Sequence, residues 1–475
     1  MIVPELASDF KYFEKEVFQR CCALGREVLK EALENWDIQL MEERDCNVYR
    51  HKGKCRTTIK TVMGEVEYRR VVYTYQNSDG KTVTVYLLDE AMGIEGSGLM
   101  SSLLSEKIAL ACCEGSYRNA ARSVSEMTGQ TISHTAAWGV VQNIGAGIDA
   151  QELEGAKAVQ AQSGAGEIGA KLLFEEMDGI WLKLQGKSRK EHGPGKEMKL
   201  AIAYDGAKKE GKKHYELTNK VACANFEGAE AFHKRKEGVI AGTYNIDEID
   251  MRFLNGDGAA WIKQSIIDET IHFQLDPYHR NQAIRTHVKN PDMRKQILKL
   301  LYDKDIDNLL IYIEALSNSV DNEEERENLA TLWGYFDNNK EGLVPCHRRG
   351  LELPQPPEGI VYRRMGAMES NIFSILGNRM KGRRACWSIN GGNNLARLLC
   401  LKSTQRLPGA LQSLTTLTLP EKYAEEIITG LTPAKVGKSV GKGYNGFHKT
   451  IAPPTPNYKW LRGLGSLRPL SGLSK

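Results

Sequence analysis

Three acidic residues lie where carboxylates from separate elements of a fold could hold divalent metal ions. Asp178 lies in the apolar stretch LLFEEMDGIWLKL, Asp257 ends an alternating strand pattern at NGDG, and Glu369 starts a predicted helix. Magnesium and manganese ions prefer several oxygen ligands. Two such ions, ~4 Å apart, can clamp the attacking and leaving oxygens of a phosphoryl transfer. The sequence therefore predicts Mg²⁺ (or Mn²⁺) bound by Asp178, Asp257 and Glu369, which would be both the metal ligands and the catalytic residues.

Two further residues are predicted as accessory groups of this site. Asp276 follows the alternating residues of a second strand, and His279 comes three positions later in DPYH. Each acid also has an ordinary structural interpretation. Asp178-Gly179 and Asp257-Gly258 are common turn pairs, and Asp276 is well placed to cap a helix. These alternatives stay open on the sequence alone.

The elements that must position the acids lie between residues 171 and 284. Strands are predicted at Leu172–Leu184, Met198–Tyr204 and His214–Ala224, followed by a helix at Phe226–Ile240. Next come a strand ending at Asp257, a helix with Ala259, Ile262 and Ile266 on one stripe, and a strand ending at Asp276. This order predicts parallel strands with a right-handed crossover. Three antiparallel strands followed by alternating helices and strands predict a ribonuclease-H-like mixed sheet core.

The remaining chain predicts a multidomain fold of mixed α+β and α/β type. The core would comprise residues 171–284 and 360–400, with the acid-rich segment 285–355 as a helical insertion. Residues 1–45 predict helix and residues 46–100 a small basic β module, with Asp45–Arg56 as a basic turn. Residues 146–170 are rich in Ala, Gly and Gln and predict a connection between domains.

Residues 101–150 predict a helix-turn-helix DNA-binding region. Helices at Ser116–Met127 and Ser133–Gln142 flank a glycine-containing turn, a pattern used to read the major groove. The second helix would offer four DNA-binding side chains near its start, namely Ser133, His134, Thr135 and Trp138. An ordinary helical hairpin is the alternative.

Basic residues suggest further contacts with DNA phosphates. Glu369, at the start of its predicted helix, is followed by three arginines, Arg379, Arg383 and Arg384, and this helix would lie against DNA. The alternative is a basic helix end that is simply exposed to solvent. Residues 431–475 form a basic flexible tail with eight Lys or Arg and no acid. Such a tail suits a phosphate backbone.

Composition bounds the remaining possibilities. Across 475 residues, 64 Lys plus Arg nearly balance 60 Asp plus Glu, so overall charge argues only weakly for nucleic acid. No apolar run approaches the roughly 18 residues that suggest a membrane span, and the start MIVPELASDFKYFEK is unlike a signal peptide. The ten cysteines lack CxxC spacing, which indicates free thiols. The sequence therefore predicts a cytoplasmic, nucleoid-associated protein without a membrane partner.

In seven ordered segments over roughly residues 45–400, the sequence resembles bacterial insertion-sequence transposases of the ISLre type, within the acidic-triad (DDE) superfamily. The segments are YRHKGKCRTTIKTVMGEVEYRR, YLLDE, SYRNAARSVSEMTGQTISHTAAW, EEMDGIWLKLQ, LNGDGAAWIK, DPYHRNQAI and GAMESNIFSILGNRMKGRRACWS. The resemblance implies a ribonuclease-H-like core with a helical insertion before the last acid. It also implies Asp178, Asp257 and Glu369 as the triad, with His279 in an accessory helix motif.

The expected function is therefore Mg-dependent cleavage at the ends of an insertion sequence, followed by strand transfer. The expected partners are double-stranded DNA, as terminal inverted repeats and target, and further copies of the chain in a homo-oligomer on DNA. Two alternatives stay open. One is a non-enzymatic helix-turn-helix regulator derived from a transposase, and the other is a related metal-dependent nuclease.

Overall fold

The computed structural model describes residues 9–93, 100–161, 166–212, 214–382 and 384–415. They fall into two compact units, which divide between Ser101 and Ser102. Both units combine helices and strands, so the predicted multidomain α+β character is confirmed at this level. Within the described ranges, no helix has the length and apolar composition needed to cross a lipid bilayer.

The first unit is an antiparallel sheet covered by a long helix. Its elements are α1 (Phe10–Glu43), β1 (Arg50–Thr61), β2 (Gly64–Gln76), β3 (Thr82–Val85) and α2 (Leu87–Ala91), with the strands in the order β1-β2-β3. Trp36 of α1 packs with Ile59 and Tyr68 of the sheet. The prediction of a basic turn at Asp45–Arg56 is wrong for its second half. β1 already begins at Arg50, and its mostly exposed start leaves no apolar alternation to read.

The second unit begins with three helices, α3 (Ser102–Glu114), α4 (Tyr117–Thr128) and α5 (His134–Gln160). The two predicted helices of the helix-turn-helix are present, but α5 continues 18 residues beyond Gln142, so the connection predicted at 146–170 is wrong over most of its length. Small residues there allow close packing. A Cβ at Gly145 would lie 2.4 Å from Asn394 Cβ, and one at Gly155 would lie 3.3 Å from the Gly238 carbonyl oxygen.

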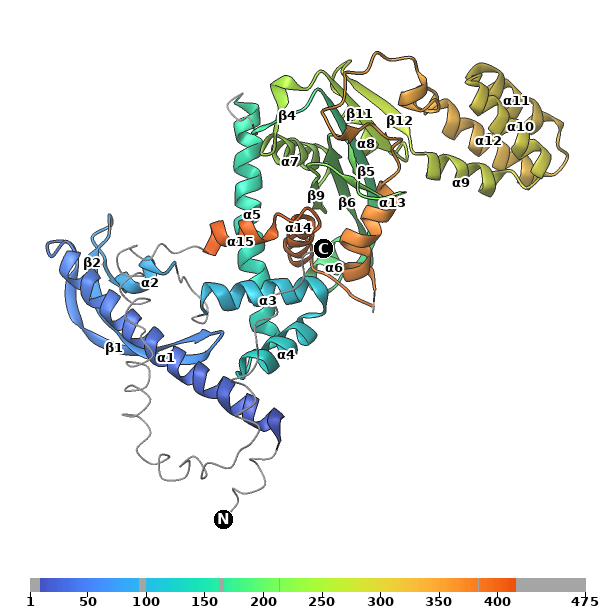
Figure 1. Ribbon diagram of the computed structural model, residues 1–475. Helices are drawn as coiled ribbons and strands as arrows, with labels where there is room; N and C mark the ends of the chain where they lie inside the picture. Colours follow the sequence, from blue (N-terminus) through green and yellow to red (C-terminus); the bar gives the residue numbers. More distant parts are fainter. Residues whose placement is uncertain (1–8, 94–99, 162–165, 213, 383, 416–475) are drawn as a thin grey trace, which may run out of the picture. The chain divides into compact units, whose positions relative to one another are not determined.

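A five-stranded mixed sheet forms the centre of the second unit (Figure 1). Its strands are β5 (Leu172–Lys183), β6 (Gly195–Tyr204), β9 (Val221–Asn225), β11 (Met251–Gly256) and β12 (Ile271–Leu275), in the order β12-β11-β5-β6-β9. The pairs β5–β6 and β6–β9 are antiparallel. β11 is parallel to both β5 and β12.

The helices between these strands are α6 (Gly186–His192), α7 (Ala229–Ala241) and α8 (Ala260–Lys263). The predicted strand–helix–strand unit is present as β11–α8–β12. Its helix is only four residues long, and Ile266, expected on the buried stripe, is 38% exposed. The strand predicted at His214–Ala224 is interrupted at Asn219, which has a φ of 50°.

Small strand pairs and 3-10 turns complete the core. They are β4 (Ile168–Gly169) with β10 (Tyr244–Asn245), β7 (Ala207–Lys209) between β8 (Tyr215–Leu217) and β13 (Ile360–Val361), and the turns η1 (Ile246–Glu248), η2 (Lys340–Gly342) and η3 (Cys346–Arg348).

The predicted insertion is helical. After α9 (Pro277–His287) it contains α10 (Pro291–Asp303), α11 (Ile306–Ser319) and α12 (Glu323–Asp337). Its buried residues Ile297, Leu309 and Phe336 share one core cluster with Phe273 and Leu275 of β12. Figure 1 shows α10–α12 at the opposite end of this unit from α3 and α4. The insertion is therefore anchored at the β12 edge of the sheet.

The chain then returns to the sheet through α13 (Met368–Asn371), the π-helix η4 (Ile372–Lys381), α14 (Ile389–Ser403) and α15 (Leu407–Thr415). The helix predicted at Met368–Met380 is present, and Met368, Ile372, Ile375 and Leu376 are buried as predicted. π-Helical turns are rare and frequent at functional sites. This one directly follows the turn that carries Glu369.

Candidate active site

The register of the parallel strands places three acids in one row. Asn255 of β11 is paired with Glu176 of β5 and Gln274 of β12. Residues two positions apart on a strand share a face. Two positions further along each strand, at the carboxyl ends of β11 and β12, come Asp178, Asp257 and Asp276. The sheet therefore directs these carboxylates to one edge region.

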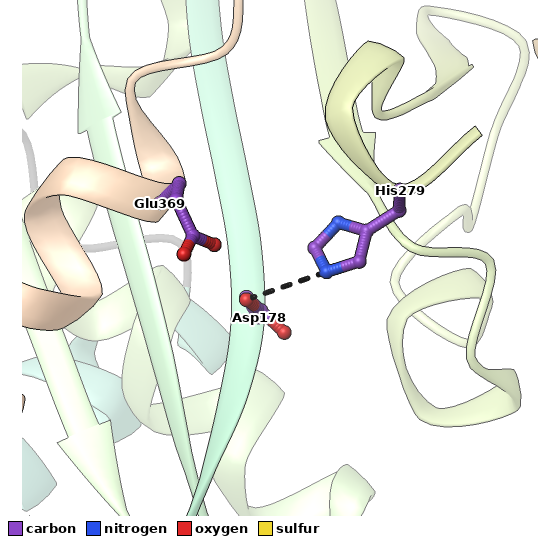
Figure 2. Close-up of side chains that lie close together, drawn as sticks. All are labelled: Asp178, His279 and Glu369. Carbon is purple, nitrogen blue, oxygen red and sulfur yellow. Dashed lines mark ion pairs between the residues drawn. The ribbon is translucent and has the colours of Figure 1, made fainter. Parts of the chain in front are cut away.

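A compact metal-capable group forms beside this row. Ligand atoms of Asp178, His279 and Glu369 all lie within 4.8 Å of one another. Figure 2 shows the three side chains converging from β5, the start of α9 and the start of α13. His279 Nε2 is 4.0 Å from Asp178 Oδ2. The structure thus brings together two predicted triad members and one predicted accessory residue.

Asp257 is not part of that group. Its Oδ1 accepts the backbone N–H of Ala259 at 2.9 Å, and the Tyr335 hydroxyl donates to its carbonyl oxygen at 2.8 Å. Its charge nevertheless acts on Asp178 and His279, and it raises the pKa of both. Asp257 therefore lies near the group while its carboxylate also stabilises the turn into α8.

Asp178 is a destabilised carboxylate. Burial raises its pKa from 3.8 to about 6, and the charges of Asp257 and Glu369 add to this rise. A hydrogen bond from the Gly179 N–H, at 2.7 Å, and the charge of His279 offset it only in part. A bound cation would reverse the balance because it favours the charged form.

Asp276 orients His279. Its Oδ2 accepts the backbone N–H groups of Tyr278 and His279, as expected for the predicted helix cap, and lies 3.1 Å from His279 Nδ1. This hydrogen bond raises the pKa of His279. Burial alone would raise the pKa of Asp276, but hydrogen bonds from His279 and Asn255 lower it. With Nδ1 engaged, Nε2 is the ring nitrogen that faces Asp178.

Glu176 fixes the start of the Glu369 helix, a role that the sequence analysis missed. It is fully buried and accepts the backbone N–H groups of Gly366, Ala367 and Met368 at 3.0–3.1 Å. The Tyr204 hydroxyl also donates to it, at 2.6 Å. Burial raises its pKa. The available signal was an acid two positions before Asp178, on the same face of an otherwise apolar strand.

The donor set fits a divalent cation. Two carboxylates offer the oxygen ligands that Mg²⁺ and Mn²⁺ prefer, and an imidazole nitrogen is also a common ligand of transition metals. A histidine whose other nitrogen is held by a carboxylate is the usual arrangement of a metal ligand. The raised pKa of Asp178 indicates carboxylate charge that the described protein groups leave uncompensated.

The first turn of α5 presents the predicted reading residues. His134 and Thr135 are exposed, and Trp138 is 45% exposed. Ser133 is exposed too, but its Oγ accepts the Ala136 N–H at 3.0 Å and so caps the helix. The side chains of His134 and Thr135 are therefore accessible, and that of Trp138 is partly accessible beside Gly391 of α14.

Arg379 has packing contacts that the sequence analysis did not predict. Its Nε donates to the Cys112 carbonyl at 2.7 Å, and its guanidinium lies over the rings of Tyr117 and Trp387. Arg379 therefore connects α3 and α4 to the Glu369 helix, and the DNA contact predicted for it stays a prediction beside this packing role. Arg384 is exposed. Arg383 and the predicted tail 431–475 lie outside the described residues.

Residues 7–410 match the sequence model of an uncharacterised protein family, UPF0236. The chain belongs to this family. The "UPF0236 protein in vanSb 3′region" of Streptococcus gallolyticus is 22% identical over 408 residues, which cover 83% of this chain and 82% of the relative. A UPF0236 protein of Caldanaerobacter subterraneus subsp. tengcongensis, named with eleven numbered designations from TTE0033 to TTE2212, is 25% identical over 384 residues, which cover 79% and 74%.

These matches correct the family expected from the sequence motifs. The assignment to ISLre-type transposases is wrong, because the family shown is UPF0236 and the relatives carry that name alone. The match also begins at residue 7, and so includes the helix α1 that the seven motifs left out. The family description gives no activity, so the functional conclusion rests first on the site.

Proposed function

We propose that the chain is a divalent-metal-dependent DNA transposase that cleaves at the ends of a mobile element and joins the freed end to target DNA. The observation that carries the proposal is the convergence of Asp178, Glu369 and His279 from three separate elements. Asp257 lies in the same row of the sheet, and its charge already acts on Asp178. We retain it as the third acid.

The order of the strands supports a ribonuclease-H-like core. Numbered along the chain, the strands lie in the order third, second, first, fourth and fifth. The first three are antiparallel, and the last two run parallel to the first. Functional groups in open sheets collect at the carboxyl ends of parallel strands, where Asp257 and Asp276 lie.

The proposed reaction has two displacements at phosphorus. In the first, a water oxygen forms a bond to phosphorus while the bond to the 3′ oxygen breaks, which leaves a 3′ hydroxyl. In the second, that hydroxyl attacks a target phosphodiester, and the 3′ oxygen of the target leaves. Divalent ions, when bound, would supply the positive charge that stabilises the attacking and leaving oxygens.

The residues of the chain position these reactants and handle protons. Asp178 and Glu369 would hold the cations, since their oxygens already converge. His279 is held by Asp276 with Nε2 toward Asp178. Its hydrogen bond with Asp276 raises its pKa, and an imidazole held in this way could bind and pass on a proton. The exposed first turn of α5 would read the terminal repeats, and two element ends require at least two copies of the chain.

The name of one relative adds independent support. It joins eleven numbered designations within one bacterium. We take these as copies of the gene at several places in one genome, which is the distribution that a self-moving element produces. A metal-dependent housekeeping nuclease has no need of such copies.

The test is a joining assay with the purified full chain, Mg²⁺ and labelled duplexes. The duplexes carry the sequences of the two element ends, which lie on either side of the gene. We expect Mg-dependent cleavage and covalent joining to a second duplex, both lost in Asp178→Asn. Cleavage without joining would indicate a nuclease instead. Binding of the ends without cleavage would indicate a regulator, and either outcome would overturn the transposase proposal.

A further inference from the structure

Helix α6, at the tip of the β5–β6 hairpin, carries cations that none of the groups above use. Lys187, Arg189 and Lys190 are all exposed, and the Lys187 side chain is 87% exposed. Lys187 Nζ lies 3.6 Å from Glu191 Oε1, an exposed pair of the kind that contributes little. Among the described residues, no acidic side chain pairs with Arg189 or Lys190. The tip therefore presents net positive charge to solvent.

The hairpin is attached to the start of α14. Trp387 N–H donates to the Lys183 carbonyl, and its own carbonyl accepts from the Gln185 N–H, both at 2.9 Å. Ser188 Oγ of α6 accepts the Ile389 N–H at 3.0 Å. These bonds hold the backbone of α6 in one orientation relative to α14, so its cations extend from a fixed position.

The start of α14 in turn lies against α5. A Cβ at Gly391 would lie 3.7 Å from Trp138 Nε1, and Asn394 Nδ2 donates to Gln142 Oε1 at 2.8 Å. Helix α6 therefore contacts α14, and α14 contacts α5 near the exposed turn that begins with His134. Figure 1 shows α6 beside α14, in agreement with the Ser188–Ile389 bond.

We propose that α6 binds the phosphate backbone of the same DNA duplex that the first turn of α5 reads. The inference rests on the proposed function in taking DNA as the substrate. Lysine and arginine contacts to phosphate set the register of a protein on DNA, while base contacts from a neighbouring helix give specificity. α6 would thus position the duplex, and α5 would select its sequence.

The position of α6 relative to the acids fits a single duplex. Leu184 lies six positions beyond Asp178 (184 minus 178) on the same β5 stretch, which is roughly 20 Å of extended chain. Base pairs are stacked about 3.4 Å apart, so the same span is on the order of six base pairs. A duplex that runs along β5 with its end at the acids would reach α6 within its first turn.

The test compares two triple variants of the full chain in EDTA, so that cleavage does not interfere. The first is Lys187→Gln with Arg189→Gln and Lys190→Gln. The control, Lys295→Gln with Lys299→Gln and Lys304→Gln, removes the same charge from exposed positions in or beside α10 of the insertion. Binding to a terminal-repeat duplex and to a random duplex is measured over a series of salt concentrations.

We expect the α6 variant to weaken binding to both duplexes by the same factor. The slope of log affinity against log salt should fall by up to about 2.7, because each lost phosphate contact removes about 0.9. The control should keep the slope of the unmodified chain. An unchanged slope in the α6 variant would overturn the proposal, as would an equal loss in the control.

The result is separable from that of the joining assay. If the slope depends on α6 but no joining occurs, the DNA-backbone surface stands and the transposase proposal fails. If joining occurs and the slope is independent of α6, only the present inference fails. Circular dichroism of both triple variants should match that of the unmodified chain, because all six side chains are exposed.

Discussion

The Glu176 carboxylate accepts the backbone N–H of Met368 at 3.1 Å, directly before Glu369. Two more N–H groups, from Gly366 and Ala367, point at the same carboxylate. The first N–H groups of a helix lack partners within the helix, and they favour a negative charge. A buried acid on β5 thus sets the position from which Glu369 extends toward Asp178.

We predict that Glu176→Gln weakens metal binding at a site that it does not touch. The amide keeps the shape but turns an NH₂ toward the N–H groups of Gly366 and Met368. The variant should lose about 1–3 kcal/mol of stability, the cost of an unsatisfied buried group. It should also need several-fold more Mg²⁺ for half-maximal cleavage, measured in a metal titration on protein that remains folded.

Glu175→Gln is the matched control. Glu175 is the neighbouring buried acid, on the opposite face of β5, and it pairs with Lys236 and Arg252. Its loss leaves two buried cations with Glu237 as their remaining acidic partner among the described residues, so we expect destabilisation of up to about 3–5 kcal/mol without a change in the Mg²⁺ requirement. If both variants shift the Mg²⁺ requirement equally, Glu176 acts only through overall stability.

The raised pKa of Asp178 predicts a pH effect on the metal-free protein. A carboxyl whose pKa is about 6 when folded and 3.8 when unfolded binds its proton more tightly in the folded state. The free energy of unfolding should therefore decrease as pH rises from about 4 to about 6 and stay lower above that range. The contribution is about 3 kcal/mol at most, at about 1.4 kcal/mol per unit.

Asp178→Asn should remove this pH dependence. In denaturant unfolding with EDTA, the variant should be more stable than the unmodified chain above about pH 6 and similar to it near pH 4. Added Mg²⁺ should stabilise the unmodified chain and leave the variant unaffected, because a ligand of the native state shifts unfolding by mass action. A variant that is less stable at every pH would contradict the burial argument.

The sequence predicted the sheet well because its strands carry regular patterns. The residues of β11 and β12 alternate and are followed by turn residues, so Asp257 and Asp276 could be placed at the carboxyl ends of these strands, whereas Asp178 lies within β5. The failures occurred where packing decides. Gly145 and Gly155 suggest a linker, yet they let α5 pack closely on neighbouring helices, and no local pattern reveals such a contact.

The candidate site was predictable only in part for a related reason. Asp178 and Glu369 were predicted from the strand and helix patterns, and the structure brings them together although the transposase family assignment is wrong. The compact group contains His279 in the place where the sequence predicted Asp257. Which of the two residues reaches the group depends on side-chain directions at the end of β11 and the start of α9. The packing of Arg379 over Tyr117 could not be predicted either, because it depends on tertiary contacts between α4 and the Glu369 helix.

The role of Glu369 as a metal ligand can be tested with two glutamates that differ in setting. Glu369 lies at the start of a helix anchored by Met368 and Ile372, whereas Glu358 is exposed in the proline-rich segment before β13. Metal ligands must be held within a fraction of an ångström, which favours the anchored helix. Glu369→Gln should keep folding and DNA binding while cleavage falls roughly 100-fold or more. Glu358→Gln should cleave normally, and the reverse pattern would exclude Glu369.

The first turn of α5 can be tested apart from the rest of its helix. The far end of α5 is fixed by buried ion pairs, in which Arg235 contacts Asp149 and Glu152 at 2.7 and 2.9 Å. His134→Ala with Thr135→Ala should therefore leave the fold intact, since both side chains are exposed. If these residues read bases, the discrimination between repeat and random duplex should fall by about 1–3 kcal/mol, which lowers the affinity ratio roughly 5- to 150-fold. The salt slope should stay unchanged, because base contacts release few counterions. A preserved affinity ratio would show that sequence is read elsewhere on the chain.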